Sequence, residues 1–243
     1  MLASFLIPTR NQTTMLRDSI GSIRRLASGR HDYEILLAVD SDDTDTLAMI
    51  PEIRDFLPPN ALKVVITAPK GYARLHEYYN MLAQLSSGEL LMLWNDDAKM
   101  ESPAWDTYLY ADYHDHHCFM LIPQEIHWDN KVLLSGGFPI VTRKYYEILG
   151  AFSHSPLNDR YIQDVVGRFA GDTQHYGMTS LVISHDNNHR NEDQEAHTEV
   201  FRPLLASHED PEGDIQKHIQ ADREALSIFI VNTPPMRRGV SIQ

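Results

Sequence analysis

The feature that most constrains this chain is an apolar run that leads directly into two acidic residues. Residues 90–94 (Leu-Leu-Met-Leu-Trp) precede Asn95, and Asp96 and Asp97 follow. An unbroken apolar run of this kind is typical of a strand buried on both faces, as in a parallel sheet between helix layers. Ligands of open α/β sheets bind beyond the carboxyl ends of such strands. Two carboxylates there can hold a divalent cation that also binds phosphate, although a solvated turn explains them equally well.

Strands and helices alternate in the part of the chain that precedes this run. Apolar segments at 4–7, 33–39 and 62–67 predict three more strands, and apolar side chains at helical spacing lie between them. This alternation predicts an α/β fold with a doubly wound, mostly parallel sheet and helices on both faces. The first two strands should then end at the same edge of the sheet as the acidic pair.

Beyond residue 103 the pattern is less regular and mixes short strands with helices. We expect strands at 119–123, 131–134 and 181–183, and helices at 105–113, 143–149, 160–169 and 214–230. Apart from that last helix, the residues after His189 are polar, and the pair Pro234-Pro235 predicts a poorly packed tail.

The composition of the chain excludes several classes of protein. A formal net charge of −13 is unfavourable for an extensive nucleic-acid surface, which needs many cationic contacts to phosphates. The single cysteine, Cys118, excludes an intrachain disulfide and fits a reducing compartment, so we expect a cytoplasmic protein. No apolar stretch reaches the length of a transmembrane helix, so we expect no membrane span.

Four short motifs occur in order within residues 4–100. They are Pro8-Thr9-Arg10-Asn11, Val39-Asp40-Ser41-Asp42-Asp43-Thr44-Asp45, Lys70-Gly71-Tyr72-Ala73-Arg74, and the strand that starts at Gly88-Glu89 and ends at Asp96-Asp97. In this order they resemble the inverting glycosyltransferases of family 2, and residues 135–190 resemble them more loosely. The chain departs from the family pattern at Ser41 and Trp94, which stand where acids are usual, and Arg74 lacks the asparagine that usually follows it.

The resemblance implies a GT-A fold, with a Rossmann-like, mostly parallel central sheet, helices on both faces and C-terminal elements on the acceptor side. It divides the chain into a nucleotide-sugar-binding half (1–100), an acceptor and catalytic half (101–200), and a C-terminal helix and tail (201–243). It implies a metal-dependent transferase that moves a sugar from a nucleotide-diphosphate donor, with a UDP-sugar expected, to a hydroxyl. The acceptor is open: a saccharide, another small molecule or a modified nucleobase.

Such a transfer breaks an anomeric C–O bond and leaves negative charge on a diphosphate. Mn²⁺ or Mg²⁺ held by a carboxylate neutralises that charge, with Asp97 as the first choice of ligand and Asp96 as the second. Asp96 is alternatively a partner of sugar or ribose hydroxyls. The resemblance implies a further histidine ligand from the C-terminal part, with His185 and His189 as candidates, although an ordinary surface histidine is the better interpretation of either one.

The donor pocket is expected at the ends of the first two strands. The resemblance implies that Asp40 accepts a hydrogen bond from a base N–H or a ribose hydroxyl. Arg74 could reach the diphosphate, although for it and for Arg10 a surface ion pair is nearly as good an interpretation. The residues expected to line the same pocket are Pro8, Thr9, Arg10 and Asn11.

The resemblance implies an aspartate general base near the start of a helix in the second half. Asp159 matches, on a loop ahead of the helix at 160–169, where its alternative role is a helix N-cap. The segment 136–139 (Gly-Gly-Phe-Pro) would line the acceptor side, with Trp128 and Phe138 as platforms for a sugar or base. A tight turn packed by an aromatic ring explains that segment equally well.

Two other functions fit parts of the sequence. A degenerate nucleotide-sugar-binding module without catalysis would account for Ser41 and Trp94 in place of acids. A sugar-phosphate nucleotidyltransferase shares the parallel sheet and acidic residues, but such enzymes usually carry a glycine-rich loop after the first strand. Residues 8–12 contain no glycine, which disfavours that alternative.

Overall fold

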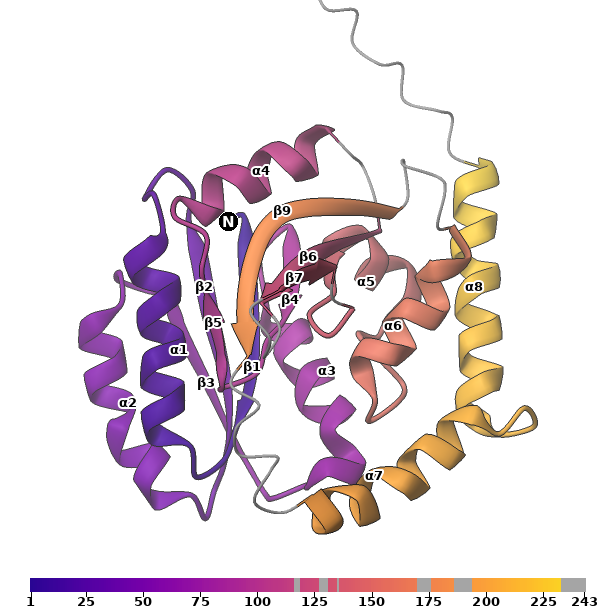
Figure 1. Ribbon diagram of the computed structural model, residues 1–243, viewed down its shortest axis with the longest axis horizontal. Coiled ribbons are helices and arrows are strands. Elements are labelled where there is room, and N and C mark those ends of the chain that lie inside the picture. Colours follow the sequence, from indigo (N-terminus) through magenta and orange to yellow (C-terminus); the bar gives the residue numbers. More distant parts are fainter. Residues whose placement is uncertain (116–118, 127–130, 135, 170–175, 186–193, 233–243) are drawn as a thin grey trace, which may run out of the picture.

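Figure 1 shows the computed structural model of this chain, which describes residues 1–115, 119–126, 131–134, 136–169, 176–185 and 194–232. The first part contains β1 (Ala3–Thr9), α1 (Thr13–Leu26), β2 (Tyr33–Asp40), α2 (Thr44–Phe56), β3 (Leu62–Thr67), the 3₁₀ helix η1 (Tyr72–Arg74), α3 (Leu75–Leu85) and β4 (Leu90–Leu93). The second part contains β5 (Ala98–Met100), α4 (Trp105–Asp115), β6 (Met120–Ile126), β7 (Val132–Leu134), β8 (Ile140–Thr142), α5 (Arg143–Leu149), α6 (Asn158–Val166), the 3₁₀ helix η2 (Gly167–Phe169), β9 (Tyr176–His185), α7 (Gln194–Glu209) and α8 (Asp214–Asn232).

The strands form one mixed sheet, in the order β3-β2-β1-β4-β8-β6-β9-β5, with β7 also paired to β6. The first four strands of this order are parallel, as the sequence predicts. Helices α1 and α2 lie on one face of this parallel part and α3 lies on the other (Figure 1). Strand β9 pairs in parallel with β6 and then antiparallel with β5, so the sheet curls around the ends of β1 and β4.

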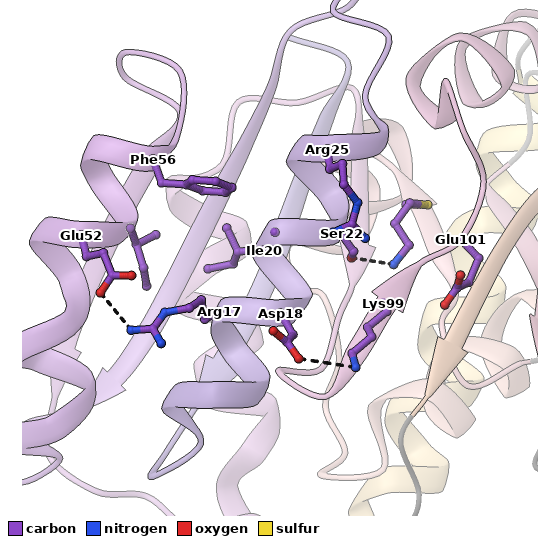
Figure 2. A pocket seen from close by; sticks show the side chains of 12 residues that line it. Arg17, Asp18, Ile20, Ser22, Arg25, Glu52, Phe56, Lys99 and Glu101 are labelled. Carbon is purple, nitrogen blue, oxygen red and sulfur yellow. Dashed lines mark hydrogen bonds and ion pairs between the residues drawn. The ribbon is translucent and has the colours of Figure 1, made fainter.

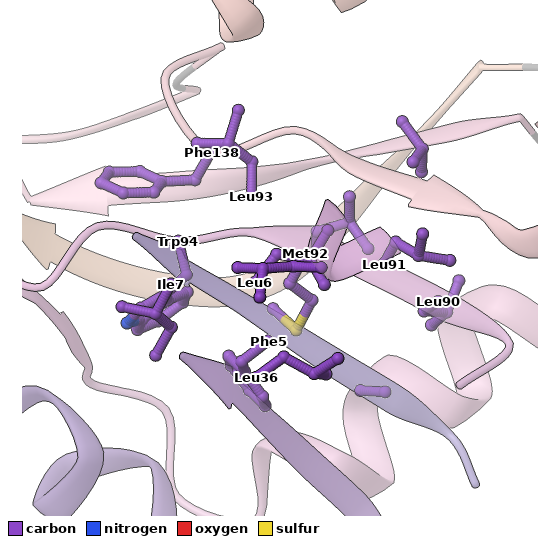
Figure 3. Packing of buried hydrophobic residues seen from close by; sticks show 14 of the residues in the cluster. Phe5, Leu6, Ile7, Leu36, Leu90, Leu91, Met92, Leu93, Trp94 and Phe138 are labelled. Carbon is purple, nitrogen blue, oxygen red and sulfur yellow. The ribbon is translucent and has the colours of Figure 1, made fainter. Parts of the chain in front are cut away.

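The core lies between the parallel strands and these helices. Every residue of β2 and β4 is buried, which is why residues 35–39 and 90–93 read as continuous apolar runs (Figure 3). Trp94 extends this core beyond the end of β4: its ring lies edge-on to Phe5, with centroids 5.1 Å apart, and its Nε1–H donates to Ser19 Oγ at 2.8 Å. The residue that replaces an acid of the family motif is therefore a core residue.

Several elements differ from the sequence predictions. Strands β5 and β8 were not predicted, because each has three residues and is defined by its pairing with distant strands. Helix α7 was not predicted either. Within 199–209 only His208 is buried, so this stretch lacks a clear apolar stripe. Helix α6 begins at Asn158, which places Asp159 in its first turn and not in a preceding loop. No helix among the described residues is long and apolar enough to cross a membrane.

The amino-terminal edge of the sheet is held by a buried carboxylate. Glu34 of β2 accepts hydrogen bonds from Ser4 Oγ at 2.7 Å and Ser87 Oγ at 2.9 Å, and Lys63 Nζ lies 2.7 Å away. Burial opposes ionisation of Glu34, but these donors outweigh it and lower its pKa below the ordinary value. Gly88 completes the turn, since a Cβ there would lie 2.7 Å from the backbone nitrogen of Ser4.

We predict that Glu34→Gln lowers the free energy of unfolding by about 2 kcal/mol at pH 7, the scale of charged hydrogen bonds. The ionised carboxylate stabilises the fold above its unfolded-state pKa, and this contribution disappears as the pH falls through the lower folded-state pKa. The difference between variant and parent should therefore shrink below about pH 4. Urea unfolding at several pH values measures it.

Glu52→Gln is the matched control for this prediction. Glu52 also pairs with a cation, Arg17, at 2.9 Å, but both side chains are more than half exposed. An exposed pair contributes at most about 1 kcal/mol, so this variant should stay close to the parent at every pH. Equal effects of the two substitutions would contradict the role assigned to Glu34.

Candidate active site

The carboxyl ends of β1, β2 and β4 meet at one rim of the sheet. Thr9 Oγ1 at the end of β1 donates to Asp96 Oδ2 beyond β4 at 2.8 Å. Arg10 Nη1 donates to Asp40 Oδ2 at the end of β2 at 2.7 Å. The structure therefore brings Pro8–Asn11, Asp40 and Asp96 together, as expected for neighbouring parallel strands.

The turn after β4 holds its carboxylates close together. Burial, opposed by the hydrogen bond from Thr9 and reinforced by the charge of Asp97, raises the pKa of Asp96 to about 6. Beneath the turn, the Tyr79 hydroxyl lies 3.1 Å from the Trp94 carbonyl oxygen. Burial raises the pKa of Tyr79 well above its ordinary value, and Asp96, Asp159 and Asp97 raise it further. The predicted base and the two predicted metal-binding carboxylates thus all raise the pKa of one buried phenol.

His185 and Asp97 form the pair of donors best suited to a cation. Asp97 immediately precedes β5, and His185 ends β9 opposite Ala98, the first residue of β5. This register places His185 Nε2 3.0 Å from Asp97 Oδ1. Among the described residues no three His, Cys, Asp or Glu side chains converge as a complete metal site. A divalent ion would therefore need phosphate or water oxygens as well. His189 lies outside the described residues.

Asp40 is buried at the base of the rim and its carboxylate is already engaged. Arg10 donates to it, and Tyr78 donates to its other oxygen in a short hydrogen bond. Burial and that carboxylate raise the pKa of Tyr78 to about 12. Arg10 also donates to Asp42 at 2.9 Å, and these two acids raise the pKa of the guanidinium. The backbone N–H of Asn11 donates to Asp43, which caps α2, at 2.8 Å.

Arg74 forms an ion pair, which was one of the two roles considered for it from the sequence. Its Nη2 donates to Glu77 Oε2 at 2.8 Å, and Lys70 Nζ lies 2.9 Å from the same oxygen. The two cations lower the pKa of Glu77 to about 2. Of the residues that the structure describes, Arg10, Lys70 and Arg74 near this rim are therefore each paired with a carboxylate.

Asp159 stands in the first turn of α6. The N-cap residue of this helix is Leu157, which makes no capping hydrogen bond through its side chain. The segment before α6 is tied to α3, because Asn80 Oδ1 accepts from the backbone N–H of Phe152 at 2.7 Å. Asp159 is not the N-cap, which removes the alternative role considered for it from the sequence.

In the segment 136–139, the space beside Gly136 is filled by a side chain of the protein and not by a ligand. A Cβ there would collide with the side chain of Gln163, whose Nε2 donates to the Gly136 carbonyl at 2.9 Å. Phe138 is only 1% exposed and packs against Trp94 and edge-on to His185, so it cannot serve as a sugar platform in this arrangement. Trp128 lies outside the described residues.

A cavity of about 460 Å³ lies along α1, away from this rim (Figure 2). Its walls come from α1, α2 and β5, with the adjoining Glu101, and it contains none of the predicted site residues. Charged side chains on its walls pair with one another, as in Arg17–Glu52 at 2.9 Å and Lys99–Asp18 at 3.7 Å. The carboxylate rim is therefore the better candidate for chemistry.

Sequence reasoning did not assign Tyr78, Tyr79 or Glu125 to the site. The two tyrosines follow the helical spacing of the α3 core stripe, which gives no sign that their hydroxyls reach the rim. Glu125 lies at the polar end of β6, and its Oε1 is 3.8 Å from His185 Nδ1. Only the register of β6 with β9 reveals that proximity.

Known structures share this fold. TarS 1-349 from S. aureus in complex with UDP-GlcNAc has a TM-score of 0.61 and 14% identity, over 96% of this chain and 74% of that one. The mannosyltransferase PcManGT from Pyrobaculum calidifontis, in complex with GDP-Man and Mn²⁺, has a TM-score of 0.60 and 13% identity, over 96% and 76%. No family model and no curated protein matches. The likeness shows the fold, and the expected GT-A architecture is confirmed.

We predict that Asp96→Asn stabilises the chain at pH 8. An acid whose folded-state pKa is raised loses stability as the pH rises through the interval between its unfolded-state and folded-state values. At about 1.4 kcal/mol per pKa unit, removing the charge should add at most about 3 kcal/mol at pH 8, with the gain vanishing near pH 4. Asparagine retains an acceptor for Thr9. Thermal unfolding across this pH range measures the effect.

Asp42→Asn is the control at the same rim. The pKa of Asp42 is lowered by its hydrogen bond to Arg10, so its removal should bring no gain in stability at pH 8. A stabilisation shared by both variants, or absent from Asp96→Asn, would show that the ionised carboxylate of Asp96 does not destabilise the fold.

Proposed function

We propose that this chain is a metal-dependent glycosyltransferase of the inverting, family 2 type. It would move a sugar from a nucleotide-diphosphate donor, with a UDP-sugar expected, to a hydroxyl of an acceptor. The observation that carries the proposal is the convergence of Thr9, Asp40 and Asp96 at one rim, with Asp97 and His185 3.0 Å apart beside them. Ligands of open α/β sheets bind at such rims.

The charges of the rim support metal dependence. Arg10, Lys70 and Arg74 are each paired with a carboxylate. Within the part of the chain that the structure describes, a donor diphosphate would meet Asp96 and Asp97 while these three cations are already engaged. A divalent ion between Asp97 and His185 would supply that charge and stabilise the departing diphosphate. The donor set, one carboxylate oxygen and one imidazole nitrogen, suits Mn²⁺ and also admits Mg²⁺.

Asp159 is the proposed general base. As the acceptor oxygen forms its bond to the anomeric carbon, its proton passes to the Asp159 carboxylate, and the bond from that carbon to the diphosphate oxygen breaks on the opposite face. The electrostatic influence of Asp96, Asp97 and Asp159 on Tyr79 supports placing the base within the same site. The segment that precedes its helix is tied to α3, which favours a fixed geometry.

The donor nucleotide is proposed to lie at the ends of β1 and β2. Asp40 has lone pairs left for a base N–H or a ribose hydroxyl, but it lies beneath Arg10, so donor binding requires Arg10 to turn away. The Arg10 side chain is 44% exposed and can do so. The complexes of similar fold with UDP-GlcNAc and with GDP-Man and Mn²⁺ support a nucleotide sugar as the donor class.

Donor binding is testable by thermal shift with UDP-sugars and GDP-sugars, with and without Mn²⁺. We expect one donor to raise the melting temperature, and to do so much more with Mn²⁺ than without it. Asp97→Asn should lose the Mn²⁺-dependent part of the shift. A shift that is equal with and without Mn²⁺ would contradict metal dependence, and the absence of any shift would contradict the donor class.

Catalysis is testable with the donor found in this way. Asp159→Asn should lower kcat for donor hydrolysis or transfer by roughly 10²–10⁴-fold, the usual contribution of a general base. It should leave the Mn²⁺-dependent thermal shift intact, because Asp159 is not a proposed ligand. Binding without turnover in the parent chain would favour the binding module, and release of pyrophosphate from a nucleoside triphosphate and a sugar phosphate would favour the nucleotidyltransferase.

A further inference from the structure

His185 is held from three sides at the proposed cation site. Its Nε2 lies 3.0 Å from Asp97 Oδ1, and its Nδ1 lies 3.8 Å from Glu125 Oε1. The Phe138 ring meets the imidazole edge-on, with centroids 5.3 Å apart. The histidine side chain is 9% exposed, so its two nitrogens face carboxylates and not bulk water.

The sheet register explains why Glu125 reaches this ring. Strands β6 and β9 are parallel neighbours, and Glu125 lies opposite Ile183. Side chains two residues apart on a strand share a face, so His185 stands on the same face as Ile183 and diagonal to Glu125. The Glu125 side chain is 15% exposed. A carboxylate so little exposed needs polar or charged neighbours, and the imidazole of His185 is one of them.

Each imidazole nitrogen of His185 has its own carboxylate nearby: Asp97 for Nε2 and Glu125 for Nδ1. In the absence of an ion, an Nε2–H can donate to Asp97. To bind an ion, Nε2 must offer its lone pair, and the proton must then reside on Nδ1, where Glu125 is within reach as acceptor after a small approach. Metal-binding histidines commonly donate their second N–H to a carboxylate in this way, which fixes the ring and increases its basicity.

We propose that Glu125 is the positioning residue of the cation site: it holds His185 with Nε2 directed at the ion that Asp97 shares. The inference rests on the proposed function and adds to it a residue outside the acidic motifs. Glu125 touches neither donor nor acceptor in this role, and acts through His185. It follows that the second half of the chain, through β6 and β9, sets the affinity for the metal.

The test measures free Mn²⁺ by electron paramagnetic resonance during titration of the full chain, with UDP and, separately, GDP present. Glu125→Ala should weaken Mn²⁺ binding by roughly 10–100-fold, the range for loss of such a partner. Glu125→Gln keeps an acceptor without the charge and should fall between this variant and the parent. It also keeps the experiment decisive if Glu125→Ala does not fold.

Glu101→Gln is the matched control. Glu101 directly follows β5 and lies beside β9. It accepts a hydrogen bond from Ser184, the neighbour of His185, but does not contact the imidazole. It removes the same charge, and screening should limit its effect on Mn²⁺ affinity to about twofold. Melting temperatures without Mn²⁺ should be similar for Glu101→Gln and Glu125→Gln, which separates a metal effect from a general loss of structure.

The outcomes separate the two proposals. If the parent binds Mn²⁺, Asp97→Asn abolishes binding and the Glu125 variants bind like the parent, the metal site stands and the role of Glu125 is overturned. If the Glu101 and Glu125 variants weaken binding equally, the effect is one of charge alone and the positioning role is again overturned. If the parent binds no Mn²⁺ with either nucleotide, both proposals fail.

Discussion

The candidate site depends on the antiparallel pairing of β5 with β9. Strand β5 starts immediately after Asp97, and its first residue, Ala98, is opposite His185. Strand β9 also pairs with β6, so the sheet has to curl for β5 and β9 to lie side by side (Figure 1). One short ladder thus joins the acidic turn of the first half to the histidine of the second, and a one-residue shift of its register would turn that histidine to the other face.

The cationic side chains that the structure describes near the rim are paired with carboxylates. Arg10 pairs with Asp40 and Asp42, and Arg74 and Lys70 share Glu77. The Arg10–Asp42 pair is exposed and adds little to stability. Together these pairs keep cationic side chains away from the acids beyond β4. Under the proposed function, a diphosphate would approach the acids beyond β4 on a chain whose formal net charge is −13. A divalent ion is the simplest agent that reverses it locally.

The sequence was sufficient for the parallel half of the fold and for most of the rim. Buried parallel strands must be continuously apolar, so their ends, and the acids that follow, can be located by reading the chain. The same reading could not find β5 or β8, whose existence depends on partners far away in sequence, nor α7, whose surface is largely exposed. Glu125 was missed for the same reason, because its importance comes only from register with β9.

Trp94 shows how the rim tolerates the loss of an acid from the family motif. Its indole anchors the turn to α1 through Ser19, while the Tyr79 hydroxyl of α3 reaches its carbonyl oxygen from the opposite helix layer. The turn is therefore fixed from both faces of the sheet, which keeps Asp96 and Asp97 together although burial, and to a lesser extent the charge of Asp97, raises the pKa of Asp96. A carboxylate in place of the indole would add a third negative charge and remove this anchor. The indole thus makes the turn rigid, and under the proposed function His185 would supply the metal ligand that an acid at this position would otherwise provide.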